Sequence, residues 1–232
     1  MSYKKPRLLI LGNAPLRENL SEFIDTSDIV LRFNDAFYYG FNTGRKVDIL
    51  CITNTGSSSL SIATNREILR KKINEKVSEI WFPRDSDYHK KYIIENHIDY
   101  TLNEFDDYSH EIISSNHLND KIIKKFSKEF NKTVFNKVIT YNPSYFICPS
   151  TGIMALEYII SDERFSEFEK ILVGFTFEGW KGHAWSEEQK IINSYMENRK
   201  DFKFLPTKPF KYNLTKKIVK AKTKITARLK KW

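Results

Sequence analysis

The chain has 232 residues, of which 41% are hydrophobic and 14% aromatic, and its formal net charge is +9. This composition predicts one sizeable α/β domain and excludes a disordered chain, because disordered segments lack the apolar residues that build a core. Two cysteines are too few for a secreted scaffold held together by disulfides. Cys51 and Cys148 each lie in an apolar stretch, so we expect buried free thiols in a reducing compartment.

The positive charge is concentrated at one end of the sequence. Residues 208–232 contain ten of the 38 Lys and Arg residues and no Asp or Glu, which leaves 28 basic residues against 29 acidic ones elsewhere. The segment 1–207 is therefore close to neutral, and a nucleic-acid-binding surface is not expected there. We expect a folded domain over 1–207 and a basic tail over 208–232.

The first residues do not resemble a signal peptide. Met1–Arg7 is basic, but the apolar run behind it extends only over Leu8–Leu11. Such a run fits a buried strand and is too short for a signal-peptide core or a membrane span. We therefore expect a cytoplasmic protein.

Short apolar runs alternate with segments of helical periodicity along the chain. The predicted strands cover 7–11, 28–33, 47–52, 78–82, 138–141, 170–175 and 202–205. The predicted helices cover 19–24, 66–76, 86–96, 109–130, 151–160 and 186–200. This alternation predicts a mostly parallel sheet flanked by helices, in which ligands bind at the carboxyl ends of the strands.

Polar residues follow the first two predicted strands. Gly12 and Asn13 end the first strand, where glycine allows the backbone to pass close to a ligand and the Asn13 amide offers a donor and an acceptor. Asn34 follows the second strand. The Gly-Asn turn has neither the glycine spacing of a dinucleotide fingerprint nor the Lys-Ser/Thr of a P-loop.

A Pro-Ser-Thr-Gly sequence over 149–152 opens a predicted helix. Ser150 is a natural N-cap, and the free N–H groups of a first helical turn attract a carboxylate or a phosphate. A helix cap without a ligand is the alternative interpretation.

His183 lies on a loop just before the predicted helix over 186–200. Its neutral imidazole suits proton abstraction from a hydroxyl near neutral pH. Glu188 could orient this ring, or could simply occupy the first helical turn, where carboxylates are favoured. The remaining histidines have no metal-ligand spacing and are expected on the surface: His89, His97, His110 and His117.

Taken in order, these segments resemble the sialylmotifs of the family 29 sialyltransferases. The large motif is matched by Leu9–Asn13, Asp28–Ala36, Gly40-Phe41 and Gly44–Asp48. The small motif is matched by Pro149–Leu156 and Ile171–Phe175, and the very small motif by His183 followed five positions later by Glu188.

The resemblance implies a Rossmann-like nucleotide-sugar glycosyltransferase fold. It also implies an inverting, metal-independent transfer of sialic acid, or a related sugar such as Kdo, from a CMP-sugar donor to a glycan hydroxyl, with no cofactor besides the donor. The residues implied are His183 as general base with Glu188 at the catalytic centre, and Gly12, Asn13, Asn34, Ser150, Thr151 and Gly152 around the nucleotide sugar and its carboxylate.

The sequence departs from the family pattern in two places. Only seven residues, Thr176–Gly182, separate Phe175 from His183, so the further His-aromatic motif of the animal enzymes is absent. Cys148 stands where many members have Tyr before Pro-Ser, and Tyr141 or Tyr145 is a candidate for the missing hydroxyl. The residue that stabilises the leaving phosphate is therefore unassigned.

Two other functions fit parts of the sequence. Asp85 and Asp87 follow a predicted strand and match the Asp-x-Asp of metal-dependent glycosyltransferases that use nucleotide-diphosphate sugars, although Ser86 and Asp87 also suit a loop and a helix cap. The basic tail fits a non-catalytic membrane-binding or nucleic-acid-binding protein, which the near-neutral remainder and the three ordered motifs disfavour.

Apolar residues recur at three- or four-residue steps in the tail. This spacing predicts a basic amphipathic helix at the anionic inner leaflet, where a bacterial enzyme that builds surface glycans would meet lipid-linked acceptors. A disordered or nucleic-acid-contacting tail is the alternative. The apolar positions are Leu214, Ile218, Ala221, Ile225, Leu229 and Trp232.

Overall fold

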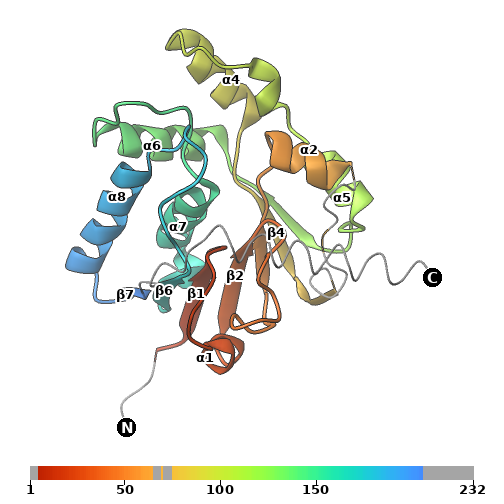
Figure 1. The fold of residues 1–232 in the computed structure, drawn as a ribbon, viewed down its shortest axis with the longest axis vertical. Coiled ribbons are helices and arrows are strands. Elements are labelled where there is room, and N and C mark those ends of the chain that lie inside the picture. The colour runs from red at the N-terminus through yellow and green to blue at the C-terminus, as the bar shows by residue number, and fades with distance from the viewer. Residues whose placement is uncertain (1–4, 65–68, 70–74, 206–232) are drawn as a thin grey trace.

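Seven strands form one parallel sheet in the described part of the chain, which is residues 5–64, 69 and 75–205 of a computed structural model (Figure 1). The order across the sheet is β5-β4-β3-β2-β1-β6-β7. The chain therefore builds outward from β1 to β5 on one side, and then returns to place β6 on the other side of β1. The strands are β1 (Arg7–Leu11), β2 (Ile29–Phe33), β3 (Ile49–Cys51), β4 (Glu79–Phe82), β5 (Ile122–Lys125), β6 (Glu169–Val173) and β7 (Phe202–Leu205).

Helices cover both faces of the sheet, so the predicted fold class is confirmed (Figure 1). The α-helices are α1 (Ser21–Asp25), α2 (Ser57–Ala63), α4 (Ser86–Glu95), α5 (Ser109–Ser115), α6 (Lys128–Ile139), α7 (Thr151–Ser161) and α8 (Trp185–Asn198). Two short 3-10 helices are η1 (Leu102–Phe105) and η2 (Glu163–Phe165).

The alternation of side chains along β1 distributes the core over the two faces. Leu8 and Ile10 belong to a core shared with α4, α6, α7 and α8, whereas Leu9 and Leu11 pack with Ile24 of α1. A second core on that opposite face joins β3 and β4 to α2 and α5. Each fully buried Leu or Ile contributes roughly 1.5–3 kcal/mol to folding, so the continuous apolar run in β1 fits its central position.

Three predicted elements differ from the structure. The helix predicted over 109–130 is interrupted, because residues 122–125 form the edge strand β5 beside β4. The strand predicted over 138–141 is instead the end of α6 and the turn after it, where Val138 faces the core one helical turn beyond Val134. Residues 57–63 form α2, whereas the polar sequence over 53–59 predicts a loop. Most of the helix predicted over 66–76, and the tail over 208–232, lie outside the described residues.

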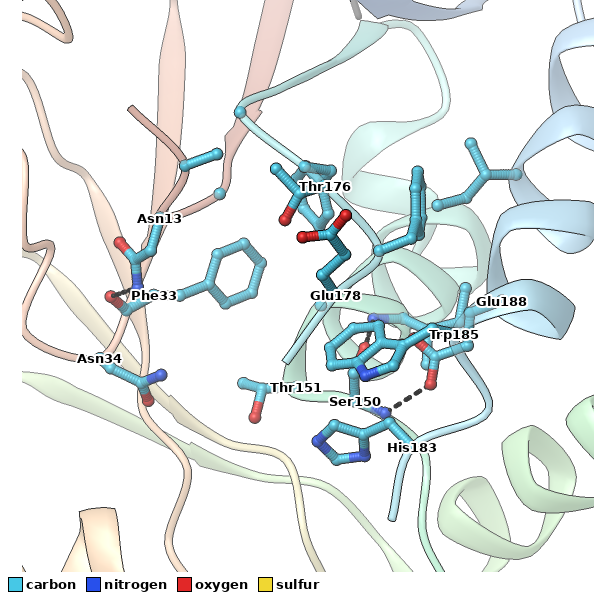
Figure 2. Close-up of a pocket in the computed structure, with 18 residues that line it drawn as sticks. Asn13, Phe33, Asn34, Ser150, Thr151, Thr176, Glu178, His183, Trp185 and Glu188 are labelled. Carbon is cyan, nitrogen blue, oxygen red and sulfur yellow. Dashed lines mark hydrogen bonds between the residues drawn. The ribbon is translucent and has the colours of Figure 1, made fainter. Parts of the chain in front are cut away.

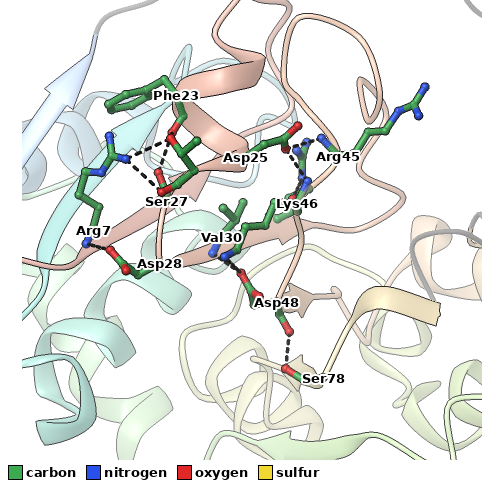
Figure 3. Close-up of polar contacts among 12 residues, drawn as sticks. Arg7, Phe23, Asp25, Ser27, Asp28, Val30, Arg45, Lys46, Asp48 and Ser78 are labelled. Carbon is green, nitrogen blue, oxygen red and sulfur yellow. Dashed lines mark hydrogen bonds and ion pairs between the residues drawn. The ribbon is translucent and has the colours of Figure 1, made fainter.

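Aspartate carboxylates accept backbone hydrogen bonds at the amino ends of the strands (Figure 3). Asp28 accepts a hydrogen bond from the backbone N–H of Arg7 at 2.7 Å, and Asp48 accepts one from Val30 at 2.8 Å. At this edge of the sheet, backbone N–H groups are therefore bound by the protein's own carboxylates. The opposite edge, at the carboxyl ends, carries the motifs described above.

Two further observations concern the described residues as a whole. Cys51 and Cys148 are free and buried, as predicted. Within the described ranges, no helix has the length and apolar character needed to span a membrane.

Candidate functional site

The loops after β1 and β6 touch each other at the point where the strand order reverses. The N–H of Gly12 donates to the carbonyl of Val173 at 2.8 Å. A Cβ atom on Gly12 would lie only 2.3 Å from the carbonyl oxygen of Gly174, which itself has φ +74°. Glycine is therefore required at Gly12 for the two backbones to approach this closely. Ligands bind parallel sheets at such a reversal of strand order.

A cavity of about 220 Å³ opens above this crossing (Figure 2). Its walls come from the ends of β1, β2 and β6, the start of α7 and the loop leading into α8. The structure brings all eight predicted site residues to this one cavity: Gly12, Asn13, Asn34, Ser150, Thr151, Gly152, His183 and Glu188.

Two asparagines hold one side of the cavity through contacts with neighbouring strand ends. The Asn13 amide donates to the carbonyl of Phe33 at 3.1 Å, which leaves its carbonyl oxygen as an acceptor. Asn34 adopts a left-handed backbone, φ +53°, and its Oδ1 accepts from the N–H of Thr53 at 2.9 Å. These bonds leave the Asn34 Nδ2 as a donor toward a ligand.

The start of α7 already has a carboxylate partner within the protein. Ser150 caps the helix, since its hydroxyl accepts from the N–H of Ile153 at 3.2 Å. Its own N–H and hydroxyl donate to the two carboxylate oxygens of Glu188 at 2.7 and 2.5 Å. Burial raises the pKa of Glu188 to about 7, although the bonds from Ser150 favour the ionised form. Glu188 thus lies in the first turn of α8 and contacts Ser150, and its carboxylate is not the group that orients His183.

A backbone carbonyl orients His183. Its Nδ1 lies 2.7 Å from the carbonyl oxygen of Cys148. A carbonyl can only accept, so Nδ1 carries the proton and Nε2 keeps its lone pair. The rings of Trp180 and Trp185 lie edge-on to the imidazole, at 4.8 and 4.9 Å between centroids. Burial, together with the charge of Arg84, lowers the pKa of His183 to about 3, which keeps the ring neutral.

Aromatic side chains form much of the remaining wall, and the sequence patterns did not predict them. Phe33 and Phe175 meet edge to face at 5.9 Å, and Phe177 lies 6.3 Å from Phe175. Aromatic residues at strand ends look like core residues in a sequence, so only the fold shows that they face a cavity. Their flat apolar surfaces suit a planar ring such as a nucleobase.

A second cavity of about 240 Å³ adjoins the first and shares Asn34, Thr151 and His183 with it. Its wall carries the hydroxyl groups of residues 53, 55, 57 and 58, together with Arg84 and Tyr100. Arg84 was missed because it follows Pro83 beside acidic residues, where nothing in the sequence distinguishes it from a surface cation. The two cavities meet at His183.

The Asp-Ser-Asp segment has a structural role at the start of α4. Asp85 is the N-cap of this helix, because its Oδ1 accepts from the N–H of Tyr88 at 2.8 Å. Asp85 and Asp87 line neither cavity, and no group of three metal-ligating side chains occurs among the described residues. The geometry therefore gives no support to a metal-dependent reaction through these two carboxylates.

His89 is buried, which corrects its predicted place on the surface. It is 1% exposed, packs against Phe105 and Phe135, and shares a 3.2 Å hydrogen bond with Asn131. Desolvation lowers its pKa well below the ordinary value. His89 is therefore a neutral core residue of α4.

Tyr141 and Tyr145 were candidates for a hydroxyl in the site. Tyr145 is 53% exposed, and Tyr141 is partly buried against the core. Neither lines the two cavities. Tyr100 is instead the tyrosine in the wall of the second cavity.

Comparison with known proteins agrees with this geometry. The family model of glycosyltransferase family 29 (sialyltransferase) matches residues 12–160, which is more than half of the chain. The chain belongs to this family. Family and fold together make it a glycosyltransferase of the sialyltransferase type, which confirms the resemblance found in the sequence.

Two solved sialyltransferases and one curated protein illustrate the likeness. A mammalian sialyltransferase has a TM-score of 0.53 at 17% identity, over 88% of this chain and 70% of that one. The sialyltransferase CstII from Campylobacter jejuni, solved with the substrate analogue CMP-3FNeuAc, has a TM-score of 0.48 at 15% identity, over 85% and 78%. The "Urease operon 23 kDa accessory protein" of Rhizobium meliloti (strain 1021) is 25% identical over 191 residues, which cover 81% of this chain and 87% of that protein.

Proposed function

We propose that this glycosyltransferase moves sialic acid, or a related keto-acid sugar such as Kdo, from a CMP-sugar to a glycan hydroxyl. The reaction would be an inverting displacement without a metal ion, with His183 as general base. One observation carries the proposal: a neutral histidine with a free Nε2 lies where an aromatic-walled cavity meets a hydroxyl-lined cavity.

The first cavity suits the CMP part of the donor. Phe33 and Phe175 offer flat surfaces to the base, and Asn13 and Asn34 offer amide groups to the ribose and phosphate. The N–H groups of Thr151 and Gly152, in the first turn of α7, have no partner within the helix and favour an anion such as the phosphate. The sugar would then extend toward His183.

His183 would act on the acceptor hydroxyl. Its Nε2 takes the hydroxyl proton while the acceptor oxygen forms a bond to the anomeric carbon and the bond from that carbon to the phosphate breaks. CMP leaves with the electron pair. The carbonyl of Cys148, 2.7 Å from Nδ1, stabilises the imidazolium that forms. Anionic substrates beside the ring would raise its low pKa on binding and strengthen it as a base.

The base is tested by His183→Ala, with His110→Ala on the exposed face of α5 as the matched control. Removal of a general base should lower turnover by about 10²–10⁴-fold, while the affinity for CMP changes little. Turnover is measured as CMP release in the presence of acceptor, and affinity by calorimetry. If His183→Ala retains more than about a tenth of wild-type turnover, another group is the base.

The donor is tested by supplying CMP-sialic acid and CMP-Kdo with a panel of acceptor glycans. We expect transfer from one of these donors, and we expect activity to persist in a chelator. Activity that depends on added Mg²⁺ or Mn²⁺ with a nucleotide-diphosphate sugar would contradict the proposal.

We further propose that the enzyme works at the cytoplasmic face of the inner membrane on lipid-linked acceptors. The support is the basic, periodically apolar sequence of residues 208–232, which lie outside the described part of the chain. Anionic lipid attracts such segments through Lys and Arg.

A further inference from the structure

The proposed substrates carry a carboxylate. Ser150, which was expected to bind it, already binds the carboxylate of Glu188. The capping N–H and hydroxyl of Ser150 both donate to Glu188. A sugar carboxylate placed there would displace Glu188 or lie against a second carboxylate. A cationic group elsewhere in the site would bind the sugar carboxylate without this conflict.

Arg84 lines the second cavity and has a guanidinium N–H without a hydrogen-bond partner. Its backbone is fixed on both sides by Asn54, whose amide donates to the Arg84 carbonyl at 2.9 Å and accepts from its N–H at 3.1 Å. One guanidinium nitrogen, Nη1, donates to the hydroxyl of Thr55 at 3.0 Å. The Nε atom is buried and has no hydrogen-bond partner. Among the described residues, no carboxylate lies within ion-pair distance of Arg84.

Two cations, Arg32 and Lys170, are buried in the described part of the chain, and both are satisfied by the protein. The Arg32 guanidinium donates to backbone carbonyls of residues 43, 44 and 46, and Lys170 binds Asp201 at 2.8 Å. Arg84 differs because it lines a cavity and has a donor without an acceptor. A buried donor left unsatisfied costs free energy, and a ligand oxygen would remove that cost.

The surroundings of Arg84 suit a sugar. Threonine and serine hydroxyls of residues 53–58 line the same cavity, with Tyr100 in its wall and His183 at its border with the first cavity. Glu104 also lines this cavity, and its carboxylate would accept hydrogen bonds from sugar hydroxyls. The charge of Arg84 reaches both titratable groups of the first cavity: it contributes to the lowered pKa of His183 and opposes part of the rise in the pKa of Glu188.

We propose that Arg84 binds the carboxylate of an acidic sugar that reacts beside His183, and that the second cavity is the subsite for this sugar. The proposal rests on the proposed function. The carboxylate belongs to the donor sugar, or to an acceptor that ends in an acidic sugar. In either case the planar guanidinium offers the carboxylate parallel N–H donors together with a positive charge.

The test uses Arg84→Gln, with Arg84→Lys to retain charge without the planar fork and Arg45→Gln as an exposed arginine outside both cavities. Calorimetry compares CMP with CMP-3-fluoro-sialic acid, which differ by the sugar and its carboxylate. Kinetics compare a neutral acceptor with an acceptor that ends in sialic acid. An unchanged circular dichroism spectrum and an unchanged urea unfolding midpoint show that each variant is folded.

Arg84→Gln should leave CMP affinity within about twofold of wild type and weaken one carboxylate-bearing ligand by about tenfold or more, the scale expected for a lost charge-assisted hydrogen bond. Weaker binding of CMP-3-fluoro-sialic acid assigns the carboxylate to the donor. A raised KM for the acidic acceptor alone assigns it to the acceptor. The affinity of Arg84→Lys for the same ligand should lie between those of Arg84→Gln and wild type. Arg45→Gln should bind every ligand as wild type does.

Two results would overturn the inference. One is an Arg84→Gln variant with wild-type behaviour toward both ligands. The other is an equal loss of affinity for CMP and its fluoro-sialyl derivative, which would make Arg84 a phosphate-binding residue. Failure of the wild-type protein to bind CMP or CMP-3-fluoro-sialic acid would instead count against the proposed function itself.

Discussion

Two buried titratable groups in the site have pKa values displaced in opposite directions. The pKa of Glu188 is raised from 4.5 to about 7, mainly by burial, and that of His183 is lowered from 6.5 to about 3 by burial and by Arg84. Between pH 4.5 and 7 the folded protein therefore holds a proton on Glu188 that the unfolded chain has released. The contribution of Glu188 to the free energy of unfolding consequently falls as pH rises through this range. His183 acts in the opposite sense, because the unfolded chain binds its proton first as pH falls through 6.5.

Glu188→Gln tests the first of these displacements. Glutamine mimics the protonated carboxyl: its carbonyl can accept from the Ser150 N–H, and its NH2 group can donate to the Ser150 hydroxyl. A shift from 4.5 to about 7 corresponds to roughly 3 kcal/mol, so the variant should exceed wild-type stability by about that much at pH 8 and match it near pH 4. Urea unfolding at pH 4, 6 and 8 measures the difference.

Glu187→Gln is the control for this experiment. The pKa of the Glu187 carboxylate is lowered, mainly because the hydroxyl of Ser186 donates to it. Glu187→Gln should therefore not raise the free energy of unfolding at pH 8. An equal difference between Glu188→Gln and wild type at every pH would show that Glu188 titrates normally.

Neighbouring residues of one motif have different tasks. Arg32 is 3% exposed and holds the loop over 43–46 through its guanidinium, whereas Asn34, two positions later, lines the cavity. Burial lowers the pKa of Arg32 to about 10. The sequence shows both polar residues at the end of one strand, Arg32 inside it and Asn34 directly after it. It cannot separate a structural cation from a ligand-binding amide, because that depends on which side of the sheet edge each one faces.

At the scale of elements, the contact between the β1 and β6 loops determines the shape of the cavity floor. Gly12→Ala places a Cβ 2.3 Å from the Gly174 carbonyl, so the loops must separate. We expect a loss of about 1–3 kcal/mol in unfolding free energy, the usual cost of overpacking, and weaker CMP binding. Urea unfolding and calorimetry measure the two effects.

Gly174→Ala disturbs the same contact, because its Cβ would lie 3.0 Å from the Gly12 carbonyl in a left-handed backbone. The double variant should therefore cost less than the sum of the two single variants. A Gly12→Ala protein with wild-type stability and CMP affinity would show that this loop yields easily and does not shape the site.

The sequence predicted the central strands well and the edges poorly. β1, β2 and β6 each contain at least three consecutive apolar residues and are buried on both faces, and their predicted bounds agree with the structure to within about two residues. β5 is an edge strand with two lysines and partial exposure, so its residues show no strand periodicity. Its strand character comes from pairing with β4, which is tertiary information.

The candidate site was also predicted only in part from the sequence. Its eight predicted residues belong to motifs that follow β1 and β2 or open α7 and α8, and the order of those motifs is visible in the chain. Arg84 follows β4 and Tyr100 lies between α4 and η1, so both are outside the segments that resemble sialylmotifs. Only the folded arrangement brings them beside His183.

At the scale of the whole molecule, the basic tail is predicted to place the enzyme on its acceptors. Removal of residues 208–232 should leave a folded protein that binds CMP and acts on small soluble acceptors. It should lose salt-sensitive binding to vesicles of anionic phospholipid and activity on lipid-linked acceptors, because Lys and Arg supply the attraction. Vesicle co-sedimentation at low and high salt makes the comparison.

A full-length variant with Lys216, Lys217 and Lys220 changed to Glu separates charge from apolar character. It should bind anionic vesicles much more weakly than wild type. Equal vesicle binding by the full-length and shortened proteins would contradict the prediction. An insoluble shortened protein would show instead that the tail packs on the domain.

The strand order also has a consequence for how the protein is made. Of the described strands, β1 leaves the ribosome first, yet its neighbour β6 is encoded more than half the chain later. Until β6 emerges, one edge of a strand that carries four consecutive apolar residues has no partner, which is a recognised template for aggregation. The candidate cavity, whose last wall belongs to α8, can only be completed after α8 has emerged. A nascent chain stalled before β6 should therefore depend on chaperones, and ligand should not rescue it.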